Sequence, residues 1–235
     1  MGAIYWQLNS IWQAPTWSSL EYGGRWKVLH YQVAHFFAET LVSSYLDADS
    51  TYRVYVTTDS RSSQSGNLTV STVLWSSGAV ASSWTVQSTV DTFGSVELFA
   101  QSLSSMLTAS NVTSASEIAI TLSWTFDEEK EQGKEVTNVF YPTSFSEVAL
   151  PEPTITISVG DTWSDGETGV ATVTVTSSAV APFAFLHTSI SGRFSSNGVL
   201  LLPNAPVNFT FFGWEDYTLQ KLQDTIKVRT VRDTY

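Results

Sequence analysis

The side chains that could do chemistry in this chain of 235 residues are carboxylates and indoles. It has 22 acidic residues, nine tryptophans, three histidines and no cysteine, which excludes a thiol nucleophile, a thiolate metal site and a disulfide. His30 and His35 are five residues apart in a segment of helical spacing and so do not share a face, and His187 stands alone. No glycine-rich phosphate loop or Ser-His-Asp signature is present. We therefore expect no metal and no cofactor.

Three Asn-x-Ser/Thr sequons begin at Asn67, Asn111 and Asn208. Asn67 and Asn111 adjoin predicted turns and are the candidate glycosylation sites. Asn208 lies inside an apolar run and would be a poor acceptor unless its side chain faces outward. Because serine and threonine are abundant, sequons also arise by chance and do not assign a compartment.

Composition narrows the fold and the partners. Hydrophobic residues make up 43% and charged residues 14%, so the chain can bury a core. The net charge of -11 argues against nucleic acid as a partner, because phosphate contacts need a basic surface. No apolar run approaches the roughly 18 to 20 residues that cross a bilayer, so we expect no membrane partner. Many serines, threonines and tryptophans favour strands over helices.

Residues 1–39 differ in pattern from the rest of the chain. The apolar run Ala3–Leu8 predicts a buried strand, and Asn9-Ser10 is its polar end. Apolar side chains then recur at steps of three and four residues, which predicts a helix: Trp26, Leu29, Val33, Phe36 and Phe37. A strand, a loop and a helix are the repeating unit of an α/β protein.

From about Leu41 the hydrophobic period changes to two, which predicts short antiparallel strands. Alternation is clearest around residues 52–57 and 117–126, and further strands are predicted at 68–75, 84–90 and 96–99, with a hairpin tip at 127–135. Pro142 and Pro151-Glu152-Pro153 mark a boundary. A second β segment follows, with predicted strands at 155–159, 170–176, 183–187, 207–212 and 225–231. Each segment is long enough for one small sandwich.

Two stretches carry a resemblance to a known family. The first is Tyr5-Trp6-Gln7-Leu8-Asn9-Ser10-Ile11-Trp12, continued by Pro15, Trp17-Ser18-Ser19, Glu21-Tyr22-Gly23 and Trp26-Lys27 through His30-Tyr31. It resembles the end of the catalytic barrel of multidomain retaining β-mannosidases. The second is Ser178–Phe183 with Gly192-Arg193-Phe194-Ser195 and Asn197-Gly198. It resembles the last domain of the animal lysosomal members of that family.

The resemblance implies a mainly β chain of two immunoglobulin-like β-sandwiches, preceded by the last strand-helix unit of a (β/α)8 barrel. It assigns residues 1–39 to strand and helix eight of the barrel, 40–148 to the first sandwich and 149–235 to the last. A whole barrel needs about 250 residues. We therefore expect a C-terminal fragment whose partner is the missing barrel of the same enzyme.

Retaining glycoside hydrolysis uses two carboxylates about 5 to 5.5 Å apart. In the resembled family these are glutamates on earlier barrel strands, so this chain holds no catalytic residue and is expected to be inactive alone. The resemblance places Trp6 as a stacking platform for a β-mannoside oligosaccharide, with Asn9 and Trp12 as weaker candidates at the rim. The family usually has Asp where this chain has Ser10.

The expected function is the C-terminal part of a β-mannosidase that removes terminal β-linked D-mannose from oligosaccharides, as in N-glycan breakdown. A lysosomal location is implied by the resemblance alone. The alternative is a non-catalytic tandem sandwich that binds glycans or partners, for which Trp163 and Trp214 are candidate stacking residues. The other tryptophans that we expect in the core or at domain interfaces are Trp17, Trp26, Trp75, Trp84 and Trp124.

Overall fold

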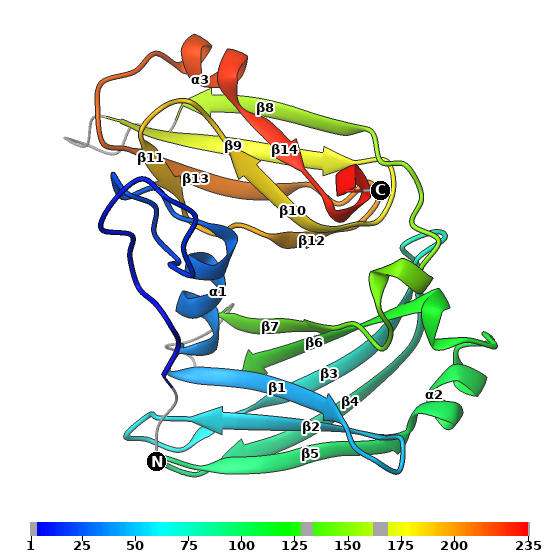
Figure 1. Cartoon of the computed structure of the whole chain (residues 1–235). Helices are drawn as coiled ribbons and strands as arrows, with labels where there is room; N and C mark the ends of the chain where they lie inside the picture. Colours follow the sequence, from blue (N-terminus) through cyan, green and yellow to red (C-terminus); the bar gives the residue numbers. More distant parts are fainter. Residues whose placement is uncertain (1–3, 128–133, 162–168, 235) are drawn as a thin grey trace. The chain divides into compact units, whose positions relative to one another are not determined.

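The computed structural model describes residues 4–127, 134–161 and 169–234 (Figure 1). The chain forms two compact units. The middle unit is Phe37–Pro151, and the terminal unit joins the segment up to Phe36 with the segment from Glu152 onward. The second boundary therefore falls inside the predicted proline-rich segment.

The middle unit is built from two antiparallel sheets. One has the order β1-β2-β5, with β1 Thr40–Leu46, β2 Thr51–Thr58 and β5 Ser95–Ser102. The other has the order β4-β3-β6-β7, with β4 Val80–Val90, β3 Gln64–Leu74, β6 Ile118–Phe126 and β7 Glu135–Phe140. Helix α2, Leu103–Ala109, and two 3-10 turns, Ala115–Glu117 and Phe145–Glu147, complete the described part of this unit. The tip of the predicted 127–135 hairpin lies largely outside the described residues.

Burial in the core of the middle unit confirms the predicted alternation of apolar residues. Tyr52, Val54 and Val56 of β2 are fully buried, as are alternate residues of β6 from Ile118 to Trp124. The two sheets contribute to one hydrophobic cluster, so one face of each sheet is covered by the other. The mainly β fold predicted from alternation is therefore confirmed.

Gly66 in β3 allows a close approach by β6. A Cβ atom at this position would lie 2.5 Å from the carbonyl oxygen of Thr125 and 2.7 Å from the indole of Trp124. Trp124 is fully buried. Glycine is required here because the neighbouring strand and its largest core side chain fill the space that a side chain would occupy.

Charged groups lie on the open face of the β1-β2-β5 sheet. The Arg53 guanidinium is 2.7 Å from the Asp47 carboxylate and 3.2 Å from that of Glu97. Hydrogen bonds with the side chains of Asp49 and then Arg53 lower the pKa of Asp47 to about 2. Asp47 also accepts the Thr51 N–H at 2.9 Å, which closes the β1-β2 turn.

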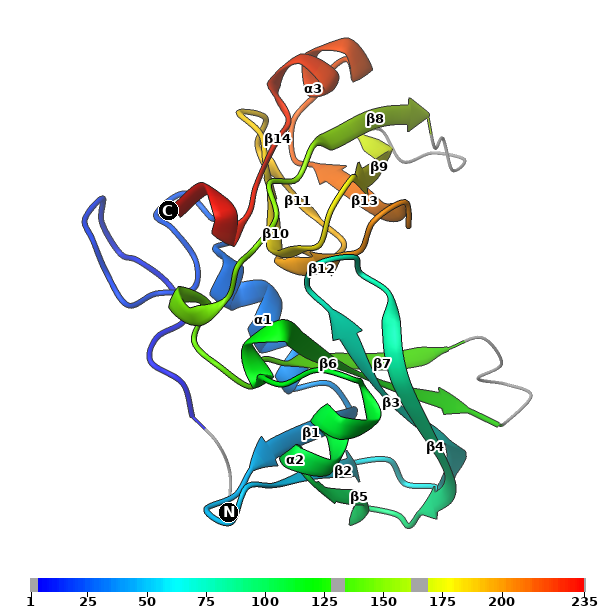
Figure 2. The same ribbon diagram turned by 90° about the vertical axis from the view of Figure 1, so that its right-hand side faces the viewer.

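The terminal unit also holds two antiparallel sheets (Figure 2). One has the order β11-β13-β9-β8, with β11 Gly192–Phe194, β13 Val207–Gly213, β9 Val170–Ser177 and β8 Ile155–Asp161. The other has the order β12-β10-β14, with β12 Val199–Leu201, β10 Ala181–His187 and β14 Lys227–Arg229. Their inner faces share one core cluster that includes Val173, Leu186 and Phe209. A 3-10 turn at Val231–Thr234 follows β14.

Helix α1, Val28–Phe36, forms within the predicted helical segment and packs on the sandwich of the terminal unit. Tyr31 is 8% exposed and belongs to that core. Its hydroxyl oxygen accepts the backbone N–H of Phe194 at 3.1 Å. Helix α1 therefore docks through Tyr31 on a strand that lies more than 150 residues later in the chain, whereas Leu29 and Phe36 of the predicted apolar stripe are exposed.

Two predicted strands differ from the structure. The run predicted at 225–231 is a strand only at β14, because residues 219–225 form helix α3, Leu219–Thr225. The Thr218 hydroxyl accepts the Lys221 N–H at 3.1 Å and caps this helix, and Leu222 is buried beneath it. Thr218 is a helix-capping residue that indicates this helix in the sequence, but the alternating pattern that follows it favoured a strand.

The strand predicted over residues 3–8 is absent from the described residues 4–8. Ile4 is 97% exposed and Leu8 54%. A buried strand needs neighbours on both sides to satisfy its backbone, and the described part of the chain supplies pairing only from residues 19 and 20. None of the described helices is both long and apolar enough to cross a bilayer.

Candidate functional site

The loop that precedes α1, residues 4–27, is called the N-terminal loop. Backbone hydrogen bonds of 2.9 Å run from Ser19 to Gln7, from Leu20 to Leu8 and from Ser10 to Leu20. Gly23 and Gly24, both at positive φ, make the turn that returns the chain toward α1. The loop therefore has a fixed backbone at its base although it contains neither a helix nor a regular strand.

The predicted sugar-binding residues all lie on the N-terminal loop and are open to solvent. Trp6 is 74% exposed and Trp12 67%, and the side chain of Asn9 is also exposed. Trp17, which we expected in a core or interface, is 79% exposed. An indole with a free face can stack on the C–H face of a sugar ring. The roles of Trp6, Asn9 and Trp12 in sugar binding stay predictions.

Ser10 is buried within the N-terminal loop in a cluster of hydroxyl groups. It is 7% exposed and shares hydrogen bonds with Ser18 at 2.6 Å and Thr16 at 2.9 Å. The Lys27 ammonium donates to Ser18 at 3.2 Å. Position 10 therefore positions the loop in this chain and offers no carboxylate to a ligand.

Ser19 connects the loop to α1. Its hydroxyl donates to the Leu8 carbonyl at 2.9 Å, so it must accept from its other two partners, Tyr5 at 3.1 Å and His30 Nδ1 at 2.9 Å. This fixes the proton of His30 on Nδ1. Burial lowers the pKa of His30, which favours this neutral form.

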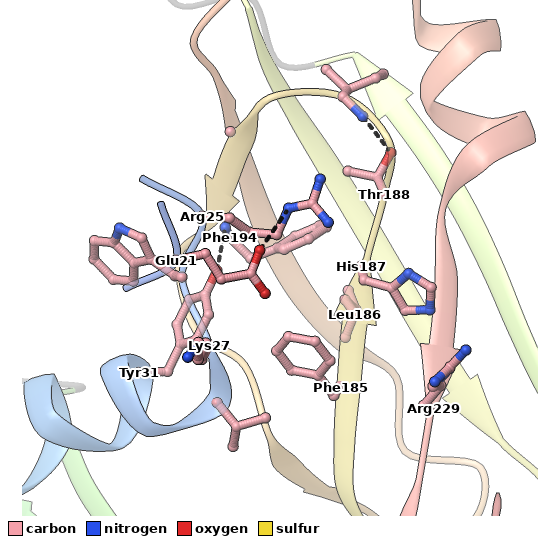
Figure 3. Close-up of a pocket in the computed structure, with 14 residues that line it drawn as sticks. Glu21, Arg25, Lys27, Tyr31, Phe185, Leu186, His187, Thr188, Phe194 and Arg229 are labelled. Carbon is pink, nitrogen blue, oxygen red and sulfur yellow. Dashed lines mark hydrogen bonds and ion pairs between the residues drawn. The ribbon is translucent and has the colours of Figure 1, made fainter. Parts of the chain in front are cut away.

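A pocket of about 380 Å³ opens in the terminal unit between the N-terminal loop and the sandwich (Figure 3). The loop and the start of α1 contribute Glu21, Arg25, Trp26, Lys27, Val28 and Tyr31. The sandwich contributes Phe185–Thr188, Ile190, Gly192, Phe194 and Arg229. The lining is apolar at Phe185, Leu186 and Phe194 and carries charged groups around them.

Some polar groups that line the pocket have a charged or hydrogen-bonding partner, and burial shifts the pKa of two of the lining groups. Arg25 lies 3.9 Å from Glu21, and both side chains are largely exposed. Burial raises the pKa of Tyr31, and the hydrogen bond from Phe194 opposes the shift. Burial also lowers the pKa of His187, together with the positive charges of Arg229, Lys227 and Arg25.

Sequence reasoning did not find this pocket. Its walls come from segments about 160 residues apart, so no local spacing joins Arg25 to His187. His187 stands alone in the sequence, within the strand predicted at 183–187, and the structure places it in β10. Only the Gly23-Gly24 turn marked the segment that folds back over the sandwich.

The three sequons differ in accessibility. Asn111 is exposed between α2 and the 3-10 turn that begins at Ala115. Asn67 sits in the central strand β3, and its side-chain amide donates to Asp127 at 2.8 Å. Asn208 faces outward from β13, and its Oδ1 accepts from Thr174 at 2.7 Å. Asn111 is therefore the sequon that best suits attachment of a glycan.

The sheet order and core of the terminal unit define an immunoglobulin-like β-sandwich. Residues 150–234 match the family model of the mannosidase Ig-fold domain. The whole chain is 35% identical to the β-mannosidase of Mus musculus and 35% identical to that of Bos taurus. It spans 26% of the length of each of these curated relatives.

A solved structure shares the fold of the chain. The β-D-mannosidase from Dictyoglomus thermophilum superposes with a TM-score of 0.76 at 18% identity. The match covers 96% of this chain and 26% of that structure. The resemblance to β-mannosidases, read first from the opening motif and the last domain, is confirmed.

Proposed function

We propose that this chain is the C-terminal part of a β-mannosidase that hydrolyses terminal non-reducing β-D-mannose residues of oligosaccharides. The observation that carries the proposal is 35% identity over the entire chain to a β-mannosidase of which it spans only 26%. Two carboxylates must flank the scissile bond in such a reaction. They would lie in the part of the enzyme outside this sequence, so the chain alone would be inactive.

In this proposal residues 1–39 are the end of the (β/α)8 barrel, residues 40–148 a first immunoglobulin-like sandwich and 149–235 the last. Helix α1 would be the final barrel helix. The exposed apolar side chains of the N-terminal loop support this role, because a surface such as Ile4, Leu8 and Ile11 is normally covered. The rest of the barrel would cover it and would pair the backbone of residues 4–8 as a strand.

The N-terminal loop would supply one wall of the sugar site. Barrel enzymes carry their sites at the carboxyl ends of the strands, which is where Trp6 and Asn9 would then lie. Stacking would let Trp6 exclude water from one face of the mannose ring, with Asn9 and Trp12 at the rim. The sandwiches would brace this end of the barrel. The oligosaccharides of N-glycan breakdown and a lysosomal location would fit such an enzyme.

Replacement of Trp6 in the longer polypeptide tests this role. One indole face covers about 100 Å² of apolar surface, so its loss costs about 2.5 kcal/mol, or roughly 70-fold in kcat/KM. Trp6→Ala should therefore reduce hydrolysis of a chromogenic β-mannoside by about that factor. Trp17→Ala is the matched control, because Trp17 is similarly exposed on the same loop and has no assigned role in sugar binding. Equal losses in the two variants would contradict the assignment of Trp6.

A free-standing glycan-binding tandem sandwich is the second candidate. It is favoured by Trp214, which is 49% exposed in the terminal unit, whereas Trp163 lies outside the described residues. Titration of this chain with β-mannosides separates the two functions. Saturable millimolar binding that Trp214→Ala abolishes would support the second candidate, and binding that is absent or insensitive to that change would count against it.

A further inference from the structure

The pocket of the terminal unit collects positive charge in a chain whose net charge is -11. Arg25, Lys27 and Arg229 line it, and Glu21 is the one carboxylate among its lining residues. The Lys27 ammonium donates to Ser18, so its charge is directed into the N-terminal loop. Arg229 has no ion pair within the described ranges. Arg25 and Arg229 are therefore the two guanidinium groups that a ligand could meet.

Among the described residues that line this pocket, His187 in β10 has a side chain that lacks a hydrogen-bond partner at one ring nitrogen. Its Nε2 atom is buried and has no hydrogen-bond partner among the residues that the structure describes. Burial and the charges of Arg229, Lys227 and Arg25 all act against the imidazolium. Figure 3 draws His187 between the guanidinium groups of Arg25 and Arg229. An anion between these guanidinium groups would offset their charges and would lie beside the His187 ring.

Helix α1 adds to the positive potential. The pocket is lined by Val28, the first residue of this helix of nine residues, and the first turn contains no acidic side chain. The N-terminus of a helix carries a partial positive charge and free N–H groups. The helix N-terminus and the two arginines therefore both favour an anion in the pocket.

The size of the pocket limits its ligand. A volume of about 380 Å³ is near the lower end of the range for small-molecule sites. Phe185, Leu186 and Phe194 form an apolar part of the lining, which lowers the local dielectric and strengthens charge-assisted hydrogen bonds. A phosphate or carboxylate group, free or on a molecule the size of a monosaccharide, suits these dimensions.

We propose that this pocket is an oxyanion-binding site, in which Arg25 and Arg229 bind a phosphate or carboxylate group beside the His187 ring. Glu21 opposes binding, because it is paired with Arg25 and repels an anion. Occupation of the site would stabilise the imidazolium of His187 and raise its pKa, since the anion would offset the charges of Arg25, Lys227 and Arg229. The site does not depend on hydrolysis of a β-mannoside.

Titration of the whole chain with inorganic phosphate and, separately, with acetate tests the proposal and distinguishes the two anions. The His187 ring signals are followed by NMR near neutral pH, with ionic strength held constant by chloride. We expect a saturable shift at millimolar anion and a higher pKa of His187 in the bound form. The anion that binds more tightly identifies the chemistry of the natural ligand.

Variants separate the site from general attraction of anions. Arg229→Gln and Arg25→Gln should each weaken binding about tenfold, the loss expected for a charged hydrogen bond. Glu21→Gln should strengthen it about threefold by removing a like charge. Arg61→Gln is the control, because Arg61 is exposed in the middle unit. The proposal is overturned if neither anion gives a saturable shift, or if Arg61→Gln weakens binding as much as Arg229→Gln.

Discussion

Tyr31 is the residue through which the stability of the docked N-terminal segment can be measured. Its side chain is 8% exposed, and its hydroxyl oxygen is the acceptor for the N–H of Phe194, which is itself 3% exposed. Tyr31→Phe keeps the ring and leaves that buried N–H without an acceptor. The expected cost is about 1 to 3 kcal/mol. Tyr31→Ala also leaves a cavity, and its expected cost is about 3 to 5 kcal/mol.

Hydrogen exchange followed by mass spectrometry resolves the two units separately. Tyr31→Phe should accelerate exchange in the terminal unit by about 5- to 160-fold, the range that corresponds to 1 to 3 kcal/mol. The strands β9, β11 and β13 should report this change, and the middle unit should not. Tyr22→Phe is the control, because Tyr22 is 57% exposed on the same segment, and it should change stability by less than about 0.5 kcal/mol. If Tyr31→Phe and Tyr22→Phe behave alike, the segment does not dock on this sandwich through Tyr31.

Three further predictions concern the middle unit. Gly66→Ala should destabilise it by about 1 to 3 kcal/mol in urea, because the new Cβ meets the neighbouring strand at 2.5 Å, whereas Gly160→Ala in β8 meets nothing and should be tolerated. Equal effects would contradict the packing. Because the pKa of Asp47 is lowered to about 2, its stabilising contribution is present above pH 4 and lost as the pH falls toward 2. Asp47→Asn should abolish that pH dependence, and carboxyl NMR that finds an ordinary pKa would refute it. In a eukaryotic secretory host, Asn111→Gln should remove one glycan mass and Asn67→Gln none, while the opposite result would reverse the assignment.

The strands are the part of the fold that the sequence predicts best. Alternation over residues 52–57 and 117–126 identifies β2 and β6 because one face of each strand packs against the opposite sheet. The proline-rich segment around Pro151 marks the boundary between the units for an equally local reason, since proline interrupts a sheet ladder. Both features depend on residues that are close together in the sequence, so local patterns predict them.

Features that depend on distant partners were not predictable in the same way. The run at residues 3–8 has the composition of a buried strand, but the described chain gives it no strand on either side. The pocket joins Arg25 to His187 and Arg229 only after α1 has docked through Tyr31. The candidate sugar residues Trp6, Asn9 and Trp12 came from the family resemblance, and composition alone would have placed Trp6 in a core.

Hydrolysis of a chromogenic β-mannoside is the measurement that tests the central claim most directly. It compares this chain alone with the longer polypeptide encoded by the transcript that contains it. The proposal predicts no turnover by the chain, because the catalytic carboxylates would lie outside this sequence, and measurable turnover by the longer polypeptide. Turnover by the chain alone, or a folded longer polypeptide without β-mannosidase activity, would contradict it.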